Sequence, residues 1–166
     1  MLRIIEDKIE VRLANGLAAF EPTDGISCIT IAGMGGRLIA DILAAGLEKL
    51  ANVSRLVLQP NNREDELRAW LVDHDFRIVD EAILEENEKF YEILVVEQGS
   101  QELTAKELRF GPYLMREQAP AFVQKWSKEV EKLAFALEQV PVENQSARAS
   151  LEERIAHIKE VLHVSK

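Results

Sequence analysis

The sequence predicts an α/β protein with a mostly parallel sheet, followed by an antiparallel helical hairpin. Up to residue 97, apolar runs of strand length alternate with stretches of helical periodicity. A glycine-rich turn, residues 33–36, joins one of these strands directly to a helix. Beyond Thr104 no strand pattern recurs, and apolar residues repeat at alternating three- and four-residue spacings. The length of 166 residues fits one domain with a modest additional element.

The first part of the chain contains two predicted strands and a helix. Residues 8–13 alternate apolar and polar side chains, which is typical of a half-buried strand. Residues 26–32 form a β-branched run typical of a buried strand, and we expect Cys28 within it to be a small core residue. Apolar residues at helical spacing from Leu38 to Leu50 predict the helix that follows the glycines.

A further strand, a second helix and a strand pair complete the predicted sheet. Residues 55–60 form a short apolar strand, after which Asn62 is expected to cap a helix with acidic residues in its first turn. Residues 76–84 and 90–97 are strand-like and are joined by a charged turn of hairpin length. They should pair as an antiparallel hairpin, so we expect a mostly parallel sheet with one antiparallel strand at an edge.

The segment after Thr104 predicts two long helices. The first carries the apolar seam of a coiled coil, formed by Val123, Trp126, Val130, Leu133, Leu137 and Val140, and Pro141 ends it. The second carries a matching seam of Leu151, Ile155, Ile158 and Leu162. Two seams joined by a short polar loop predict an antiparallel hairpin. The predicted division is therefore residues 1–103 for the α/β part and residues 104–166 for the helical hairpin.

Composition and charge exclude several classes of protein. Hydrophobic residues make up 47% of the chain and charged residues 30%, as in globular proteins rather than disordered or disulfide-rich ones. No apolar run reaches the roughly 18 residues of a membrane span, and a single cysteine predicts a reducing cytoplasm. A formal charge of −9 argues against a nucleic-acid partner. However, residues 104–166 hold 10 basic and 9 acidic residues, which is compatible with RNA contact.

The sequence offers neither a metal site nor a catalytic nucleophile. The histidines His74, His157 and His163 are far apart in sequence or on different helix faces, so they do not match the spacing of metal ligands. No serine, lysine or cysteine stands in a setting that would activate it as a nucleophile. We therefore expect no bound metal and no covalent intermediate.

Three polar or glycine-rich loops follow three of the predicted strands, at residues 13–18, 33–36 and 59–63. Each has a plain structural explanation as a turn or a helix cap. The middle loop reads G-x-G-G rather than G-x-G-x-x-G, which argues against a nicotinamide dinucleotide. Because loops at the carboxyl ends of parallel strands meet at one edge of the sheet, the three together predict a cofactor pocket.

Four segments resemble the bacterial TrmK family, the tRNA (adenine22-N1)-methyltransferases that use S-adenosylmethionine. They are RLANGLAAFE, ITIAGMGGRLIADIL, RLVLQPNNREDELRAWL and KFYEILVVE, in the order of that family. The resemblance runs from about Lys8 to the C-terminus. It implies a class I, Rossmann-like methyltransferase sheet with an appended helical hairpin, S-adenosylmethionine as the cofactor and tRNA as the partner.

The resemblance also implies roles for individual residues. It implies that Asn15, Gly16 and Leu17 lie beside the adenine of the cofactor. It also implies that Ala32 and Gly33 lie near the methionine end. The residues expected to line the transfer site are Gly33, Met34 and Gly35. Those expected to contact the target base or the tRNA phosphates are Arg37, Gln59, Asn61, Lys125, Lys128 and Lys132, although a solvated helix face is the ordinary place for each lysine. Adenine N1 already carries a lone pair, so its attack requires no general base, and whether any residue acts as one stays open.

The sequence departs from the family pattern at its N-terminus. Family members begin with a strand and a glycine-containing motif that wraps the methionine part of the cofactor, followed by an acidic residue for its ribose. Residues 1–7 hold neither. We therefore expect an N-terminally truncated member with an exposed sheet edge, a tendency to self-associate and weak or absent cofactor binding. There are two alternatives. The chain is a non-catalytic RNA-binding or interaction fragment, or the missing N-terminal residues are encoded upstream of this sequence.

Overall fold

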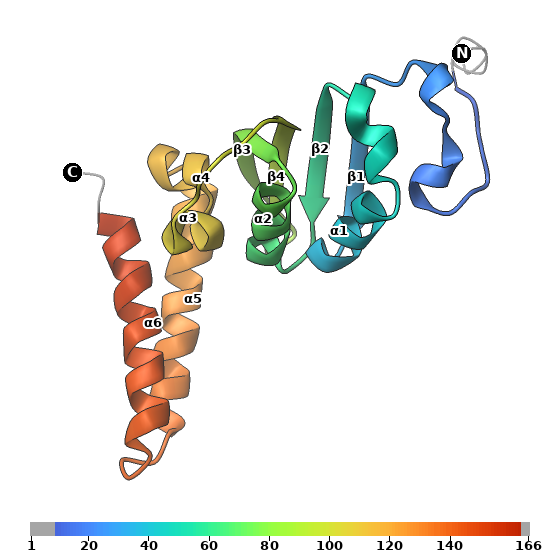
Figure 1. Ribbon diagram of the computed structural model, residues 1–166. Coiled ribbons are helices and arrows are strands. Elements are labelled where there is room, and N and C mark those ends of the chain that lie inside the picture. The colour runs from blue at the N-terminus through green and yellow to red at the C-terminus, as the bar shows by residue number, and fades with distance from the viewer. Residues whose placement is uncertain (1–8, 164–166) are drawn as a thin grey trace.

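The computed structural model describes residues 9–163, which form a four-stranded sheet with helices on one face. A helical hairpin lies at one edge of the sheet (Figure 1). The strands are β1 (Cys28–Met34), β2 (Arg55–Pro60), β3 (Phe76–Glu86) and β4 (Lys89–Gln98). They lie in the order β1-β2-β4-β3, with β1 parallel to β2 and with β4 antiparallel to both of its neighbours. The predicted α/β class is confirmed.

The predicted β-hairpin forms one edge of the sheet, but its antiparallel strand is not the outermost one. β4 lies between β2 and β3, so the prediction of an antiparallel strand at the edge was wrong. The apolar pattern explains this order, because Leu94 and Val96 of β4 are fully buried and need neighbours on both sides. β3 ends in the exposed Glu85 and Glu86, and charged residues suit an edge strand.

The segment before β1 departs from the prediction. Residues 9–13 form no strand, and Val11 and Leu13 are 90% and 104% exposed, while Lys8 lies outside the described residues. Within residues 9–163 the outer edge of β1 has no partner strand, and residues 9–13 do not pair with it. The segment continues instead into two short 3₁₀ helices, η2 (Gly16–Ala19) and η3 (Pro22–Asp24).

Burial in β1 is also lower than predicted. Only Ile31 in this strand is buried, and Cys28, expected in the core, is exposed. β1 is an edge strand within the described part of the chain, and the helices cover only one of its faces. The alternating side chains on the other face of β1 are therefore left uncovered by the described residues.

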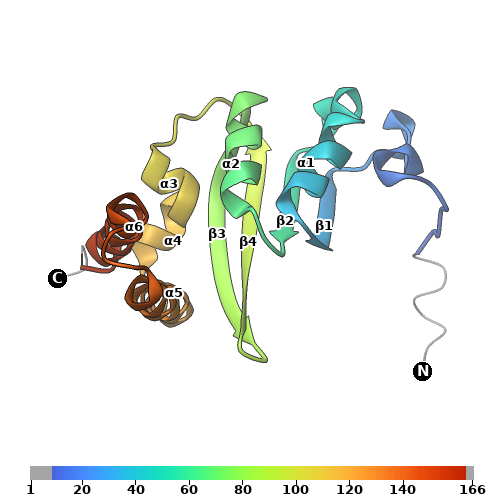
Figure 2. The same ribbon diagram turned by 90° about the horizontal axis from the view of Figure 1, so that it is seen from below.

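One face of the sheet is covered by α1 (Gly36–Ala44) and α2 (Glu64–Asp73) (Figure 2). The core between these layers includes Ile39, Leu43, Leu56, Leu58, Leu67, Leu71, Leu94 and Val96. The helix predicted to reach Leu50 ends earlier, and its last part becomes the 3₁₀ helix η4 (Leu47–Asn52) beyond Gly46. Asn62 does not cap α2, because the chain turns one residue later and Arg63, at φ 53°, is the N-cap residue.

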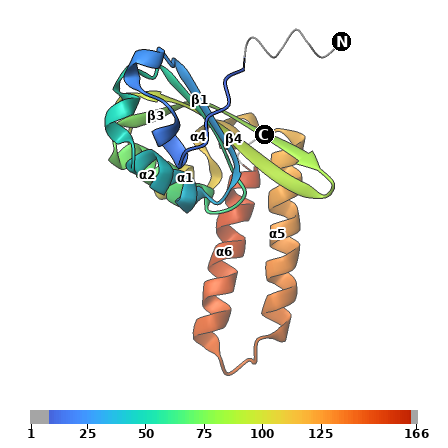
Figure 3. The ribbon, with the colours of Figure 1, turned by 90° about the vertical axis from the view of Figure 1, so that its right-hand side faces the viewer.

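In the described part of the chain, four helices follow β4: α3 (Ala105–Phe110), α4 (Pro112–Glu117), α5 (Pro120–Gln139) and α6 (Gln145–His163). Figure 3 shows α5 and α6 side by side, extending away from the sheet, so the predicted helical hairpin is confirmed. At the start of α5 the buried residue is Phe122 rather than the predicted Val123, because this end of the helix packs against Phe110 and Leu114. None of the helices within residues 9–163 is long and apolar enough to cross a membrane.

A buried cluster of charges joins the sheet to α2. Arg68 of α2 is fully buried, its Nε donates to Glu81 of β3 at 2.8 Å, and its Nη2 donates to Glu92 of β4 at 2.5 Å. A register shift between Ile78 and Asp80 turns Glu81 toward the helix side, onto the same face as Leu94 opposite it. Burial raises the pKa of Glu81, against the opposing influence of Arg68.

The same cluster fastens the C-terminal helices to the sheet. Glu81 Oε2 accepts a hydrogen bond from the backbone N–H of Tyr113 at 2.9 Å, at the start of α4. Glu92 Oε1 accepts one from Lys125 Nζ of α5 at 2.7 Å. Gly111, between α3 and α4, has φ +83°, and a Cβ there would lie 2.7 Å from Glu81 Oε2. Only glycine therefore fits where the chain crosses this cluster.

We predict that Glu92→Gln destabilises the protein strongly. The variant keeps the size of the side chain but leaves Arg68 and Lys125 without their shared carboxylate in a buried site. Removing one partner of a buried ion pair costs about 3–5 kcal/mol of unfolding free energy. Urea denaturation monitored by circular dichroism measures the change.

The matched control is Glu97→Gln on the same strand. Glu97 also joins two arginines, Arg55 and Arg77, but this cluster is exposed to water. Exposed ion pairs contribute little to stability, so this variant should unfold close to the wild type. Equal effects of the two substitutions would contradict the importance of the buried cluster.

Candidate functional site

Two of the three predicted loops are locked together at the carboxyl ends of β1 and β2. The backbone N–H of Gly33 donates to Gln59 Oε1 at 2.8 Å. The N–H of Asn61 donates to the carbonyl of Met34 at 2.7 Å, and the N–H of Gly36 donates to the carbonyl of Asn62 at 2.9 Å. The expectation that these loops meet at one edge of the sheet is confirmed for residues 33–36 and 59–63.

The glycines of the first loop have different structural roles. A Cβ at Gly36 would lie 2.4 Å from the carbonyl oxygen of Arg63, so the second loop can approach only because this residue has no side chain. Gly33 has φ +78° and open space where a Cβ would stand. The backbone at Gly33 is therefore accessible to a ligand.

The third loop lies apart from the other two. Asn15, Gly16 and Leu17 line a cavity of about 440 Å³ against α1, together with Leu38, Asp41, Ile42 and Lys49. Lys49 Nζ holds the loop by donating to the carbonyl of Phe20 at 2.7 Å. Ala32 and Gly33 are not among the residues that line this cavity, so the predicted cofactor residues fall into two groups.

A second and larger cleft, of about 630 Å³, separates the sheet from α5. Its lining consists of Asn61, Asn62, Glu64, Asp65, Phe90, Arg109, Lys125, Trp126, Lys128, Glu129 and Lys132. The cleft thus brings together four residues that the sequence predicted as substrate contacts, namely Asn61, Lys125, Lys128 and Lys132. Arg37 is exposed on α1 outside this lining, and Gln59 holds the Gly33 loop.

The three lysines of the cleft differ in how closely they are paired with carboxylates. Lys125 Nζ lies 2.7 Å from a Glu92 carboxylate oxygen and 3.0 Å from one of Glu64. Burial disfavours its ammonium form, but the two carboxylates outweigh burial and raise the pKa of Lys125. Lys128 and Lys132 have looser contacts with carboxylates, at 3.8 and 3.7 Å, and their side chains are exposed. Lys125 is therefore fixed within the protein, whereas the other two are accessible to a ligand.

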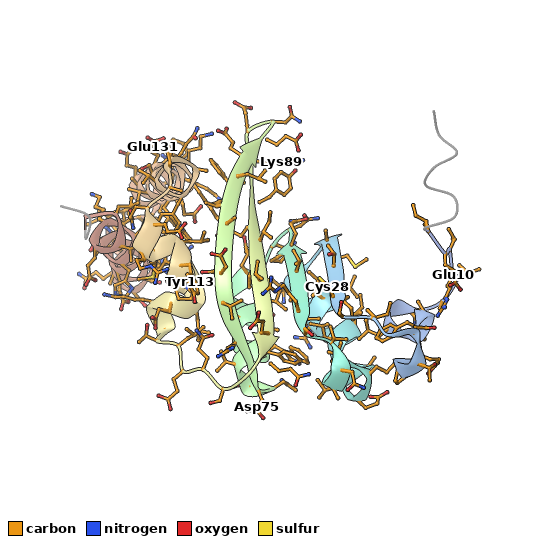
Figure 4. All side chains as sticks on the ribbon, turned by 90° about the horizontal axis from the view of Figure 1, so that it is seen from above. Glu10, Cys28, Asp75, Lys89, Tyr113 and Glu131 are labelled. Carbon is orange, nitrogen blue, oxygen red and sulfur yellow. The ribbon has the colours of Figure 1, made fainter. Side chains whose placement is uncertain are left out.

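Seven residues of the cleft were not predicted as substrate contacts, among them Phe90, Arg109 and Trp126. Phe90 is the second residue of β4, and Phe90 and Asn61 also line an adjoining hollow with Lys89 and Tyr91. Figure 4 shows Lys89 at the outer end of the β3–β4 hairpin and Glu131 of α5 on the same side of the molecule. The strand pattern located Phe90, but only the antiparallel course of β4 brings it to the end of the sheet where β2 finishes.

Within residues 9–163, no group of three or more histidine, cysteine, aspartate or glutamate side chains is arranged to hold a metal ion. The polar groups of the cleft are amides, four cations and three carboxylates, of which Glu64 and Glu129 are paired with lysines. Such a surface suits a ligand that carries both aromatic rings and negative charge.

The family model for tRNA (adenine(22)-N(1))-methyltransferases matches residues 3–160 of the chain. The chain belongs to this family, TrmK. The match includes both locked loops, the cleft and nearly all of the helical hairpin. The resemblance carried by the four sequence segments is therefore confirmed.

Individual relatives agree with this assignment. The chain is 36% identical to the tRNA (adenine(22)-N(1))-methyltransferase of Bacillus subtilis over 95% of its own length and 71% of that protein. A structure from Streptococcus pneumoniae, assigned as a tRNA (m1A22) methyltransferase and in complex with S-adenosyl-L-methionine, is 65% identical with a TM-score of 0.87. It is matched over 96% of this chain and 71% of its own. A Streptococcus agalactiae protein of the NADB-Rossmann superfamily is 59% identical, with a TM-score of 0.86 over 94% of this chain and 68% of its own.

We predict that Gly36→Ala separates the two locked loops. The new methyl group would meet the carbonyl oxygen of Arg63. This oxygen belongs to the backbone and cannot move aside as the end of a flexible side chain can. Overpacking of this kind lowers the free energy of unfolding by about 2–3 kcal/mol. Hydrogen exchange should also show faster exchange of the Asn61 amide, which is bonded to Met34.

Gly35→Ala is the matched control for this prediction. Its Cβ would lie 3.0 Å from the side-chain oxygen of Asn62, which can rotate away, and its φ of −68° suits any residue. The control should keep the slow exchange of the Asn61 amide. Fast exchange in both variants would show that the loops are not locked through Gly36.

Proposed function

We propose that this chain carries out S-adenosylmethionine-dependent methyl transfer to N1 of an adenine in tRNA. The observation that carries the proposal is the cleft beside the locked loops, because it combines Asn61 at the end of β2 with Phe90 and the lysines of α5. Family membership supports the reaction class. A tRNA substrate implies that the chain acts in the cytoplasm.

The residues present fit parts of a nucleoside cofactor. The side chain of Asn15 is exposed and makes no hydrogen bond to a described residue, so its amide can pair with an adenine edge. The exposed backbone at Ala32 and Gly33 offers close approach to the methionine end. When bound, S-adenosylmethionine supplies an electrophilic methyl group on a sulfonium sulfur. These two groups of residues would hold opposite ends of the cofactor.

The chain itself contributes position rather than covalent chemistry. Gly33, Met34 and Gly35 line the transfer site in this proposal, and Gln59 fixes their loop through the Gly33 amide. Asn61 and Phe90 offer an amide and an aromatic face to an adenine that has left its stack. Adenine N1 attacks with its own lone pair, so alignment of the reacting atoms supplies the catalytic effect and no general base is required.

The surface of the helical hairpin supplies the electrostatic part of RNA binding. Lys128 and Lys132 are accessible along α5 and can contact phosphates. Lys125 supports them by holding α5 against Glu64 and Glu92. Arg37 stays a prediction as a base contact, as does self-association through the outer edge of β1.

We predict that Asn15→Ala lowers the affinity of the purified chain for S-adenosylmethionine about tenfold, the effect of losing one hydrogen bond of about 1.4 kcal/mol. Isothermal titration calorimetry measures the affinity, and transfer of a labelled methyl group to a tRNA transcript measures activity. Asn52→Ala, an exposed asparagine on η4 outside the cavity at Asn15, is the control and should bind like the wild type.

The outcomes separate the enzyme from its alternative. Methylation at adenine N1 would support the proposal. Binding of tRNA by the folded chain without cofactor binding or methyl transfer would contradict it and would support a non-catalytic RNA-binding role. Equal affinities of the two asparagine variants would remove Asn15 from the cofactor site.

A further inference from the structure

Arg109 differs from the other cations of the cleft. The lining contains four basic residues, and the three lysines each have a carboxylate within 4 Å. Arg109 of α3 forms neither an ion pair nor a side-chain hydrogen bond with any residue of the range 9–163. Among the cations of this cleft, Arg109 is therefore the one whose N–H donors are available to a ligand.

The guanidinium of Arg109 is held in place by aromatic rings. It lies 5.1 Å from the centre of the Phe110 ring and 5.7 Å from that of Trp126. Such contacts hold the guanidinium near the rings without using its N–H donors. Arg109 is thus held in the cleft with its donors free for a ligand.

The surroundings of Arg109 favour the arrival of an anion. Burial lowers the pKa of Arg109, and the nearby positive charge of Arg154 lowers it further, against the opposing influence of Glu129 and Asp65. A cation that is half-buried and not fully compensated gains from a negative ligand. The indole N–H of Trp126, buried beneath it, also has no hydrogen-bond partner among the described residues.

We infer that Arg109 binds a phosphate of the RNA backbone in the cleft between α3 and α5. This inference rests on the proposed function, because it takes tRNA as the ligand. A guanidinium presents parallel N–H donors that match two phosphate oxygens, which the ammonium groups of Lys128 and Lys132 cannot do. Arg109 fixes the position of the backbone, and the two lysines add charge along its path.

The position of Arg109 explains how a phosphate contact there would place a neighbouring base. Asn61 and Phe90 line the same cleft at the end of the sheet, and Arg109 lines it from α3. A phosphate held by Arg109 places the backbone between α5 and the locked loops, so that a neighbouring base can reach Asn61 and Phe90. Arg109 is therefore a substrate-positioning residue.

The test compares Arg109→Gln with the wild type in binding to a tRNA transcript over a range of salt concentrations. The variant keeps an apolar stem over the two rings and removes the charge. Affinity should fall about tenfold at low salt, and the slope of log K against log salt should decrease by about one. Arg109→Lys should keep the slope and recover only part of the affinity, because the charge remains without the paired donors.

Arg116→Gln is the matched control. Arg116 also stacks on an aromatic ring, 4.7 Å from the centre of Tyr113, but it lies on α4 outside the cleft lining. Its loss removes the same charge and should leave affinity and slope unchanged. Thermal melting of each variant shows whether it folds, and Arg109→Lys keeps the test valid if the glutamine variant melts early.

Each result has one meaning. A loss of affinity confined to the Arg109 variants, with Arg109→Lys melting like the wild type, supports the assignment. Equal affinities for the Arg109 and Arg116 variants, with tight binding by the wild type, would overturn it and leave the proposed function intact. Absence of tRNA binding by the wild-type chain would overturn the proposed function and the assignment of Arg109 together.

Discussion

The buried pairing of Arg68 with Glu81 and Glu92 is the interaction on which the rest of the structure depends. It lies where α2, β3 and β4 meet, and the two carboxylates also receive Tyr113 and Lys125 from the C-terminal helices. Burying charges is costly, and an apolar cluster of the same size would stabilise a protein at least as well. The charged groups add geometric specificity, because each carboxylate oxygen accepts a hydrogen bond from a particular donor. The cluster thereby fixes where the helical hairpin sits on the edge of the sheet.

The cleft is a consequence of that placement. One wall, with Asn61 and Phe90, belongs to the sheet, and the other, with Lys128, belongs to α5. Lys125 spans both, since its ammonium is bonded to Glu64 at the start of α2 and to Glu92 on β4. The positions of the proposed base-binding and phosphate-binding surfaces are therefore set by one group of ion pairs. On the sheet side, the close approach of Gly36 to Arg63 holds the two loops rigid beside the cleft.

Local patterns predicted most of the fold, and long-range contacts account for what they missed. Glycine turns and apolar spacing located β1 to β4, α1, α2 and both long helices. Alternation did not predict the burial of Glu81, because the register shift at Ile78 reverses the inward side of β3. The alternation over residues 8–13 predicted a strand, but in the described part of the chain residues 9–13 stay unpaired beside the free outer edge of β1. The lysines of the cleft were visible in the sequence at helical spacing. Arg109 could be recognised only from the fold, which brings the distant Trp126 ring to its guanidinium.

The most direct test of the central claim uses the two tryptophans, one on each side of the buried cluster. Trp70 lies on α2 and Trp126 on α5, so Trp70→Phe and Trp126→Phe each leave one fluorescent reporter. If the ion pairs make the sheet and the helical hairpin one cooperative unit, both variants will show a single urea transition at which fluorescence and circular dichroism coincide. Loss of the Trp126 signal at a lower urea concentration than that of Trp70 would show that the helices detach first. That result would contradict the claim that this cluster holds the two parts together.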